Sequence, residues 1–309
     1  GSEMCIRDRV MTQTRTAFIA IVGCPNVGKS SILNRLLGQK VAVVSPKPQT
    51  TRTKIMGVLT EDEVQLVFTD TPGFHRPRTK LGEKMIKAVS DSISGVDACL
   101  FVIEPSGELR DAEKDLLKKF KDEKMPVILA INKIDSVKQK ELLIERMAQF
   151  SALYDFEAIV PCSALKGDGF GDLKDELFKQ AQPSPHFFPD DTLTDQPERV
   201  LAAEIIREKL LNLLDDEVPH GVAVCIERMH EREDSNITDI DATIYCERES
   251  HKGIIIGKKG EMLKKVSTKA REDMERFFMC KINLHCWVKV KEGWRNREGL
   301  IHNFGLDNE

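Results

Sequence analysis

Near the start of the chain, one short stretch has the composition of a phosphate-binding loop. It fits the pattern G-x-x-x-x-G-K-[ST]. The stretch reads Gly23-Cys24-Pro25-Asn26-Val27-Gly28-Lys29-Ser30. Its glycines let the backbone turn N–H groups inward around phosphate oxygens. We expect Lys29 to reach the outer phosphates of a nucleotide and the Ser30 hydroxyl to coordinate Mg²⁺.

The flanking residues give this stretch the context that the motif requires. An apolar run over residues 17–22 predicts a buried strand before it, and residues 31–37 predict a helix after it that begins at Ser31. A helix N-terminus directs free N–H groups and the positive end of its dipole at an anion. We therefore expect every residue from 23 to 31 to contact the nucleotide.

A second motif comes at the end of another apolar run, residues 64–69. It reads Asp70-Thr71-Pro72-Gly73-Phe74. A carboxylate at this place can hold Mg²⁺ through a water molecule, and the Gly73 N–H can face the terminal phosphate. Because Pro-Gly is also a common turn, the motif gains its meaning from the phosphate loop that precedes it. We assign residues 70–74 to the nucleotide site.

A third motif predicts which base is bound. Asn132-Lys133-Ile134-Asp135 follows the apolar run 127–131. The Asp135 carboxylate can accept hydrogen bonds from the N1–H and 2-amino groups of guanine, a donor pair that adenine lacks, so an ATPase is disfavoured. We expect Asn132 to touch the base edge and the Lys133 stem to pack on the ring face.

A fourth motif follows the apolar run 158–160 and reads Ser163-Ala164-Leu165. A short loop there can aim the Ala164 N–H at the guanine 6-oxo group. Alone, this motif is weak evidence for a nucleotide site. It becomes convincing because it is the fourth such motif in the expected order along the chain.

Residues 45–53 form a polar segment with two prolines, which predicts a loop that becomes ordered when ligand binds. A threonine hydroxyl in this loop can complete the Mg²⁺ shell when a third phosphate is present, and loss of that phosphate would release the loop. Thr50 and Thr51 are both candidates, of which we favour Thr51. Lys29, Ser30, Thr51 and Gly73 are the expected catalytic residues.

The composition sets limits on the class of protein. The 309 residues allow two domains, and the 31% charged and 41% hydrophobic residues are typical of a soluble globular protein. The eight cysteines include no C-x-x-C pair, which favours reduced cytosolic thiols over disulfides or zinc. No apolar run approaches the roughly 18 residues of a membrane span. Residues 1–10 lack the apolar core of a signal peptide, so we expect a non-native or disordered leader.

Strand and helix patterns alternate between residues 17 and 181. Strands are expected at 18–22, 55–59, 64–69, 98–103, 127–131 and 158–160, and helices at 81–94, 111–121, 138–150 and 173–179. This alternation predicts an α/β P-loop domain, a mostly parallel sheet with helices on both faces. Ligands of such sheets bind at the carboxyl ends of the strands, where the polar motifs fall. We assign residues 11–183 to this domain.

Three prolines between residues 183 and 189 interrupt the pattern and predict a linker over residues 184–198, with Phe187 and Phe188 docked on one of the domains. Beyond it the charge is uneven. Residues 186–250 hold 17 acidic and 6 basic side chains, a net charge of −11, whereas residues 251–309 hold 13 basic and 8 acidic ones, a net charge of +5. The basic segment suggests a localised site for a polyanion.

The second half carries a nucleic-acid motif. Its pattern predicts a helix at 199–214, strands at 222–232 and 240–249, a glycine loop, a basic helix at 261–278, a strand at 282–291 and a short helix at 296–304. G-x-x-G ahead of a basic helix is the signature of a KH domain, which binds single-stranded RNA. The helix-first order resembles the bacterial, type II topology, an α+β fold. We assign residues 199–309 to this domain.

The glycine loop predicts an RNA groove. Lys258 and Lys259 would face phosphates between Gly257 and Gly260, and the apolar residues before them would line a groove for unstacked bases. The expected RNA-binding residues are Ile254, Ile255, Ile256, Gly257, Lys258, Lys259, Gly260, Lys264 and Lys265. Trp287 and Trp294 could stack on bases, although for Trp287, on its strand, core packing is favoured.

Taken in order, the four nucleotide motifs resemble those of the translation-factor-like class of GTP-binding proteins. Gln49-Thr50-Thr51-Arg52 and the motif at 70–74 are similar to the Era branch, and with the KH module the resemblance covers nearly the whole chain from about Met11. The resemblance implies a GTPase that uses GTP or GDP with Mg²⁺. It also implies binding of the 3′ end of 16S ribosomal RNA in maturation of the small (30S) subunit, no obligate oligomer, and a cytoplasmic protein partly associated with the inner face of the cell membrane.

Two positions qualify what the resemblance implies. Where many GTPases carry a glutamine that orients water, this chain has Phe74, so we expect slow hydrolysis in the isolated protein. Asn26 matches an asparagine that helps to hold K⁺ in potassium-stimulated relatives; the alternative is that it only fits the turn. A non-catalytic guanine-nucleotide sensor and a tRNA-modification GTPase remain alternatives, although the second would need a catalytic C-terminal cysteine and a further domain. His75 is a candidate base, with a solvated loop residue as the favoured interpretation.

Overall fold

The first domain is a twisted sheet that carries the polar motifs at one edge. The computed structural model describes residues 13–45, 47, 50–52, 54–74, 79–215, 218–233 and 235–306. The expected leader at 1–10, together with Gln49, Thr53 and His75, lies outside the described residues. The strand order is β2-β3-β1-β4-β5-β6, and β7 pairs with the start of β1. The strands are β1 (Arg15–Val22), β2 (Ile55–Glu61), β3 (Val64–Asp70), β4 (Ala98–Ile103), β5 (Val127–Ile131), β6 (Ala158–Pro161) and β7 (Gln182–Pro183).

The sheet is mostly parallel, as the alternation of patterns predicts. β3, β1, β4, β5 and β6 run parallel, while β2 is antiparallel to β3 and β7 is antiparallel to β1. The carboxyl ends of the parallel strands therefore meet at one edge. Each of the six predicted strands is present, with ends that differ by no more than three residues.

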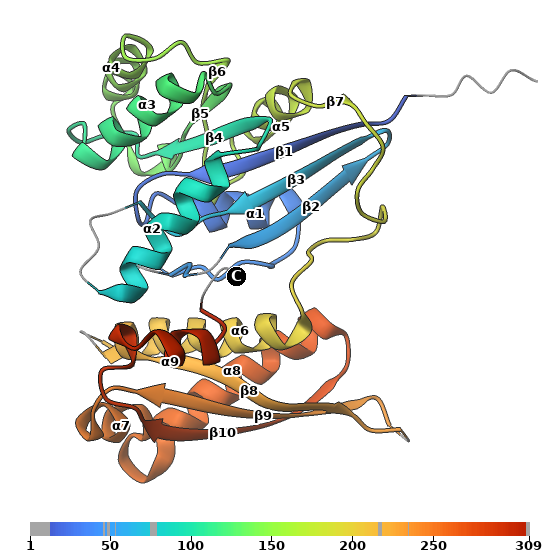
Figure 1. Cartoon of the computed structure of the whole chain (residues 1–309), viewed down its shortest axis with the longest axis vertical. Coiled ribbons are helices and arrows are strands. Elements are labelled where there is room, and N and C mark those ends of the chain that lie inside the picture. Colours follow the sequence, from blue (N-terminus) through green and yellow to red (C-terminus); the bar gives the residue numbers. More distant parts are fainter. Residues whose placement is uncertain are drawn as a thin grey trace, which may run out of the picture.

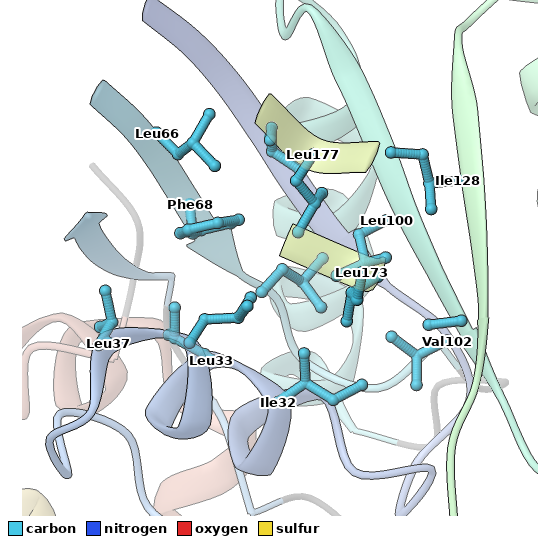
Figure 2. Close-up of a cluster of buried hydrophobic side chains, with 14 of the residues drawn as sticks. Ile32, Leu33, Leu37, Leu66, Phe68, Leu100, Val102, Ile128, Leu173 and Leu177 are labelled. Atoms are coloured by element: carbon cyan, nitrogen blue, oxygen red, sulfur yellow. The ribbon is translucent and has the colours of Figure 1, made fainter. Parts of the chain in front are cut away.

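Helices cover both faces of this sheet, because the strands are apolar on both sides. On one face lie α1 (Lys29–Leu37) and α5 (Phe170–Lys179), and on the other lie α2 (Lys80–Ile93), α3 (Asp111–Glu123) and α4 (Lys140–Ser151). Figure 2 shows the first core, where Leu33 of α1 and Leu173 of α5 meet Phe68, Leu100 and other strand residues. Successive residues of one strand enter opposite cores, since side chains alternate along a strand.

The linker is held along the first domain before it reaches the second. Gln65 of β3 accepts hydrogen bonds at its side-chain oxygen from the N–H groups of Phe187 (2.8 Å) and Phe188 (3.0 Å). The Phe187 ring lies 5.1 Å from that of Phe18, and the Val58 N–H of edge strand β2 donates to the Leu193 carbonyl at 2.9 Å. The prediction that this segment docks on a domain is confirmed, and Figure 1 shows its path.

The second domain is a three-stranded sheet covered mainly on one face. Its order is β10-β9-β8, with β10 parallel and β8 antiparallel to β9. The elements are α6 (Glu198–Leu213), η2 (Val218–Gly221), β8 (Ala223–Glu231), β9 (Ile237–Cys246), α7 (Glu249–Ile256), η3 (Lys258–Gly260), α8 (Glu261–Phe278), β10 (Lys281–Val290), η4 (Trp294–Asn296) and α9 (Glu298–Asn303). α6, α7 and α8 share one core with the sheet. The predicted α/β domain followed by a smaller α+β domain is confirmed.

Three expectations for this domain are wrong. Residues before the glycine loop form helix α7, so Ile255 is fully buried in the core and does not line a groove; Ile254 is 50% exposed. Trp287 is 49% exposed because it is on the uncovered face of edge strand β10, whereas core packing was expected. Trp294 is fully buried and donates from Nε1 to the Gly221 carbonyl at 2.9 Å, so it cannot stack on a base.

The two domains face each other through α2 and the segment after α1 on one side, and through α6, η4 and α9 on the other (Figure 1). Leu81 and Met85 of α2 share a small apolar cluster with Trp294 and Ile301. Among the helices of the described ranges, none combines the length and apolar character needed to cross a membrane.

Candidate functional site

The loop between β1 and α1 has the backbone that its sequence predicts. Gly23 (φ 150°) and Gly28 (φ 98°) have positive φ values, as does Asn26 (φ 65°). A Cβ at Gly23 would lie 2.3 Å from the Val102 carbonyl oxygen, so only glycine fits there. Gly28 precedes α1 and has no side chain with which to cap its first N–H groups. Those N–H groups are therefore available to an anion.

Lys29 supplies a positive charge inside this loop. It is 6% exposed, and its Nζ donates to the carbonyls of Gly23 at 3.1 Å and Cys24 at 3.0 Å. Burial lowers the pKa of Lys29, an effect that the nearby Asp70 carboxylate opposes. The amine is thus fixed at the loop and directed across it by two carbonyls. A cavity of about 260 Å³ opens there, lined by the loop, residues 43–45 and 50–51, Gly73 and Lys133.

Three oxygen atoms from three separate elements meet beside Lys29. The Ser30 hydroxyl of α1 donates to Asp70 Oδ2 at 2.6 Å, and its Oγ is 2.9 Å from Thr51 Oγ1. Thr51 Oγ1 donates to the same carboxylate oxygen at 3.3 Å. Asp70 is fully buried at the end of β3, and burial raises the pKa of its carboxyl against the lowering effect of Lys29.

These donors fit a magnesium ion. Two hydroxyls and a carboxylate are the hard oxygen ligands that Mg²⁺ prefers. In addition, Asp70 Oδ1 is buried and has no hydrogen-bond partner among the described residues. A buried oxygen without a partner is expected where a ligand, such as a metal-bound water, completes its hydrogen bonds. The residues that can hold the ion are Ser30, Thr51 and, through water, Asp70.

The geometry separates the two candidate threonines. Thr51 is 5% exposed and lies against Ser30 and Asp70. Thr50 instead directs its hydroxyl back to the carbonyls of its own loop, Lys47 at 2.5 Å and Ser45 at 3.4 Å. Only Thr51 of this pair is placed to reach an ion at the phosphate loop.

The motif after β3 packs directly on the phosphate loop. A Cβ at Gly73 would lie 2.7 Å from Pro25 Cα, and the Phe74 N–H donates to the Gly23 carbonyl at 3.1 Å. Thr71 donates from its hydroxyl to the Ile21 carbonyl of β1 at 2.8 Å. Phe74 is half-buried and packs against the second core, so its ring stabilises the segment.

At the other end of the site, Asn132 connects three loops. It is 2% exposed, donates from Nδ2 to the Val27 carbonyl at 2.9 Å and accepts at Oδ1 from the Ala164 N–H at 3.0 Å. Ser163 donates from its hydroxyl to Asp135 Oδ1 at 2.5 Å, which leaves the second carboxylate oxygen for a ligand. The Ala164 N–H, expected to face a guanine oxygen, is thus engaged by Asn132. Asn132 therefore positions the loops around the base. Because its side chain is buried and its amide is engaged at both ends, it has little surface left for the predicted contact with the base edge.

Glu104 is a site residue that the motifs did not indicate. Lys133 donates from Nζ to Glu104 Oε1 at 2.7 Å and to the Asn26 carbonyl at 2.5 Å, so its stem lies over the space next to the phosphate loop. Glu104 directly follows β4. The rule that placed the other polar residues at strand ends would have found it.

In the second domain, the glycine loop stands beside a groove. Lys258, Lys259, Lys264 and Lys265 are exposed around it. The cavity, about 350 Å³, lies between the start of α8 and strand β10 and is lined by Gly260, Leu263, Lys264, Ser267, Leu284, His285, Cys286 and Trp287. Because β10 is an edge strand, its outer N–H and C=O groups face this groove unpaired by any other described strand.

The groove differs from the expected one in its walls. Its apolar lining comes from Leu263 and Leu284 and not from Ile254–Ile256. Trp287 and His285 add aromatic surface, with ring centroids 6.1 Å apart. An exposed tryptophan beside lysines is a stacking surface for unpaired bases. From the sequence, Trp287 on an apolar strand looked like a core residue.

Comparison with known proteins matches both halves. Residues 18–133 match the family model described as 50S ribosome-binding GTPase, and residues 217–295 match the one described as KH domain. The chain is 48% identical to GTPase Era of Clostridioides difficile over 96% of this chain and 99% of that protein. It is 49% identical to GTPase Era of Ruminiclostridium cellulolyticum, over 94% and 97%.

Solved structures that resemble nearly the whole chain include two of Era. One is a tyrosine-to-alanine variant of Aquifex aeolicus Era bound to GDP and AlF4⁻, with a TM-score of 0.91, 37% identity and coverage of 95% of this chain and 100% of that one. The other is Era in complex with MgGDPNP and nucleotides 1506–1542 of 16S ribosomal RNA, with a TM-score of 0.90, 38% identity and coverage of 95% and 99%.

Replacing the two glycines of the second-domain loop tests its geometry. A Cβ at Gly257 (φ 75°, ψ 174°) would lie 2.6 Å from Met262 Cβ, whereas a Cβ at Gly260 (φ 80°) meets open space. We expect Gly260→Ala to lower the free energy of unfolding by roughly 1–2 kcal/mol from the left-handed backbone alone. Gly257→Ala should cost more, since it adds a steric conflict in a region almost exclusive to glycine. Urea unfolding of both variants checks this; equal costs would contradict the loop structure.

Proposed function

The chain belongs to the Era family of GTPases, and on that premise we propose that it uses GTP hydrolysis to control binding of the 3′ end of 16S ribosomal RNA during maturation of the small ribosomal subunit. The first domain hydrolyses GTP and the second is an RNA-binding KH domain. A relative that holds MgGDPNP and 16S nucleotides together supports RNA binding in the triphosphate state. Family membership sets aside the tRNA-modification enzyme and the non-catalytic sensor.

One observation carries the proposal. Thr51 touches Ser30 and Asp70 of the nucleotide site, and the residues on either side of it touch the second domain. A segment held by the terminal phosphate and its metal ion thereby also contacts the RNA-binding domain. Release of the segment after hydrolysis would change the contact, so RNA affinity would depend on nucleotide state. By linkage, RNA would change nucleotide affinity by the same factor.

We assign the chemistry of the nucleotide site as follows. Residues 23–31, except Pro25, which has no N–H, would surround the phosphates with backbone N–H groups, and Lys29 would neutralise charge on the outer phosphates. Mg²⁺, when bound, would spread the charge of the terminal phosphates. Ser30 and Thr51 would hold it directly and Asp70 through water, while the Gly73 N–H would face the terminal phosphate. Asp135 would select guanine, oriented by Ser163, and the Lys133 stem would cover the base.

The KH groove would take unpaired ribonucleotides. Lys258 and Lys259 would meet the backbone at the glycine loop, Lys264 and Lys265 would extend the positive charge, and Trp287 would stack on a base. The domain limits that go with this assignment are 11–183, 184–198 for the linker and 199–309.

We also propose that the protein is cytoplasmic and associates in part with the inner face of the cell membrane. The basic half of the KH domain is the surface that would meet anionic lipid.

Asp135→Asn tests the base contact. An amide cannot accept both guanine donors, and hydrogen bonds to a charged group contribute about 1.5–3 kcal/mol, so GTP affinity should fall by at least roughly 10-fold. Xanthine offers an oxygen in place of the 2-amino group and should be preferred by the variant. Competition between GTP and XTP for a fluorescent nucleotide measures the change. Unchanged GTP binding would refute the contact.

Lys258→Asp with Lys259→Asp tests the RNA groove. Both side chains are exposed and neither lines the nucleotide cavity, so binding of a 16S 3′-end oligonucleotide should be lost while GTP binding is kept. A matched control is Lys118→Asp with Lys121→Asp on α3, which makes the same change of net charge elsewhere. RNA binding that survives in the first variant, or is lost equally in the second, would place the groove elsewhere.

Asn26 and Phe74 predict how hydrolysis depends on cations. Phe74 has no group to orient water, so turnover by the isolated chain should be slow. Asn26 lines the phosphate cavity at a positive φ, and an ion held there would supply charge where an arginine finger does in other GTPases.

We expect faster turnover in K⁺ than in Na⁺, and loss of the difference in Asn26→Gly, which tolerates the same backbone. Phosphate release measured in each salt checks this. Equal rates in both salts for the unaltered chain would show that Asn26 only fits the turn.

A further inference from the structure

Arg52 follows Thr51 in the chain, yet its side chain is buried in the second domain. Its guanidinium donates from Nη1 to the Val222 carbonyl at 2.5 Å and from Nη2 to the His220 carbonyl at 2.9 Å. The residue is 1% exposed and lies 5.7 Å from the ring centroid of Trp294. An arginine of the first domain is therefore buried against residues of the second.

The receiving surface is a set of three consecutive carbonyls where η2 ends and β8 begins. His220 and Val222 accept from Arg52, and Gly221 between them accepts from the buried Trp294 indole at 2.9 Å. We call these three carbonyls with Trp294 the Arg52 socket. All its parts belong to the second domain, and Trp294 itself packs with Ile301 of α9. The position of Arg52 therefore restricts the orientation of the second domain relative to the first.

The charge on Arg52 makes this contact sensitive to geometry. Nearby carboxylates are already paired, Glu204 with Arg207 and Glu247 with Arg295 at 2.5 Å. Among the described residues Arg52 has no ion-pair partner, and its Nε has no hydrogen-bond acceptor. A buried charge held by two carbonyls and the face of one aromatic ring is costly once its hydrogen bonds lengthen. The contact is therefore favourable only when the guanidinium is seated in the socket.

The neighbouring residues show what sets that seating. Thr51 Oγ1 lies 2.9 Å from Ser30 Oγ in the nucleotide site. The Thr50 carbonyl accepts a hydrogen bond from Arg207 of α6 in the second domain. Residues 50, 51 and 52 thus contact the second domain, the nucleotide site and the second domain in turn.

We propose that Arg52 is the positioning residue that transmits the state of the nucleotide site to the KH domain. While Thr51 is held at Ser30 and Asp70, the guanidinium is held in the socket; when Thr51 leaves, the guanidinium is withdrawn. Adjacent Cα atoms are 3.8 Å apart, so a displacement of Thr51 carries the Arg52 backbone with it. The guanidinium would then have to change rotamer to keep both carbonyls or lose at least one of these hydrogen bonds. This inference rests on the proposed nucleotide switch and names the residue that carries its output.

Another contact between the domains provides a control. Lys80 of α2 pairs with Glu298 of α9 at 2.9 Å, with side chains 50% and 69% exposed. An exposed pair of this kind contributes little, and it does not adjoin Thr51. Lys80→Ala should leave communication between the sites intact.

The test measures one ratio in four full-length proteins: unaltered, Arg52→Lys, Arg52→Gln and Lys80→Ala. The dissociation constant for a labelled 16S 3′-end oligonucleotide is determined by fluorescence anisotropy with GDPNP and with GDP, each with Mg²⁺. The unaltered chain should bind RNA more tightly with GDPNP, by a factor within about 5–150. Lysine keeps the charge but lacks the fork that spans two carbonyls, so in Arg52→Lys and Arg52→Gln the ratio should fall close to one. GDPNP affinity in the absence of RNA shows that the first domain is folded.

The outcomes separate the inference from the function it rests on. If Arg52→Lys keeps the ratio of the unaltered chain, Arg52 does not transmit the state. A merely structural role would weaken RNA binding equally with both nucleotides and leave the ratio unchanged, which would also overturn the proposal. A ratio of one in the unaltered chain would instead refute the nucleotide switch itself. If Lys80→Ala also brings the ratio close to one, loss of any contact between the domains abolishes the effect of nucleotide on RNA binding. Arg52 would then have no special part in it, which would overturn the proposal.

Discussion

The contact on which the rest of the structure depends is the meeting of Ser30, Thr51 and Asp70. Their oxygens lie within 2.6–3.3 Å of one another, although they come from a helix, a loop and a strand end. Ser30 and Asp70 are fixed by the sheet, because α1 and β3 both pack in its core. Thr51 lies on a loop and is the member that we propose to move, and oxygens this close need a proton or a metal ion between them. In the proposed switch, the ligand bound at this point decides where residues 50–52 lie.

The parallel arrangement of the strands explains why the functional residues of the first domain gather at one edge of the sheet. β1, β3, β4, β5 and β6 each end at the same edge, and each delivers a functional residue there or just beyond, from Gly23 to Ser163. Asn132 and Lys133 connect the base side to the phosphate loop. The KH domain then lies below this edge (Figure 1), where the segment after α1 can reach it. Three consecutive residues, 50–52, thus connect the nucleotide site to the second domain, at α6 and at the start of β8.

The sequence predicted the elements whose chemistry is local. The phosphate loop, the strand-end motifs and the glycine loop need particular residues at fixed spacing, so they could be recognised without a structure. Helix α7 was missed because Ile254–Ile256 are β-branched and follow a glycine, a composition that disfavours helix; burial of Ile255 outweighs that preference. Trp287 was misplaced although β10 carries the signal. Apolar residues at 282, 284, 286, 288 and 290 pack toward the core, so Trp287 falls on the opposite face, in register with Lys281, Asn283, His285 and Lys289. Arg52 was noted only as part of the motif Gln49-Thr50-Thr51-Arg52, since nothing in the local sequence points to partners about 170 positions away.

The central claim is that binding of nucleotide changes the affinity for RNA, and that binding of RNA changes the affinity for nucleotide. Titration calorimetry tests it most directly: the affinity for GDPNP is measured with and without saturating 16S 3′-end RNA, and the affinity for RNA with and without GDPNP. The account predicts that both affinities rise, and by the same factor. Two affinities that are each unaffected by the other ligand would contradict it and leave two independent binding domains on one chain.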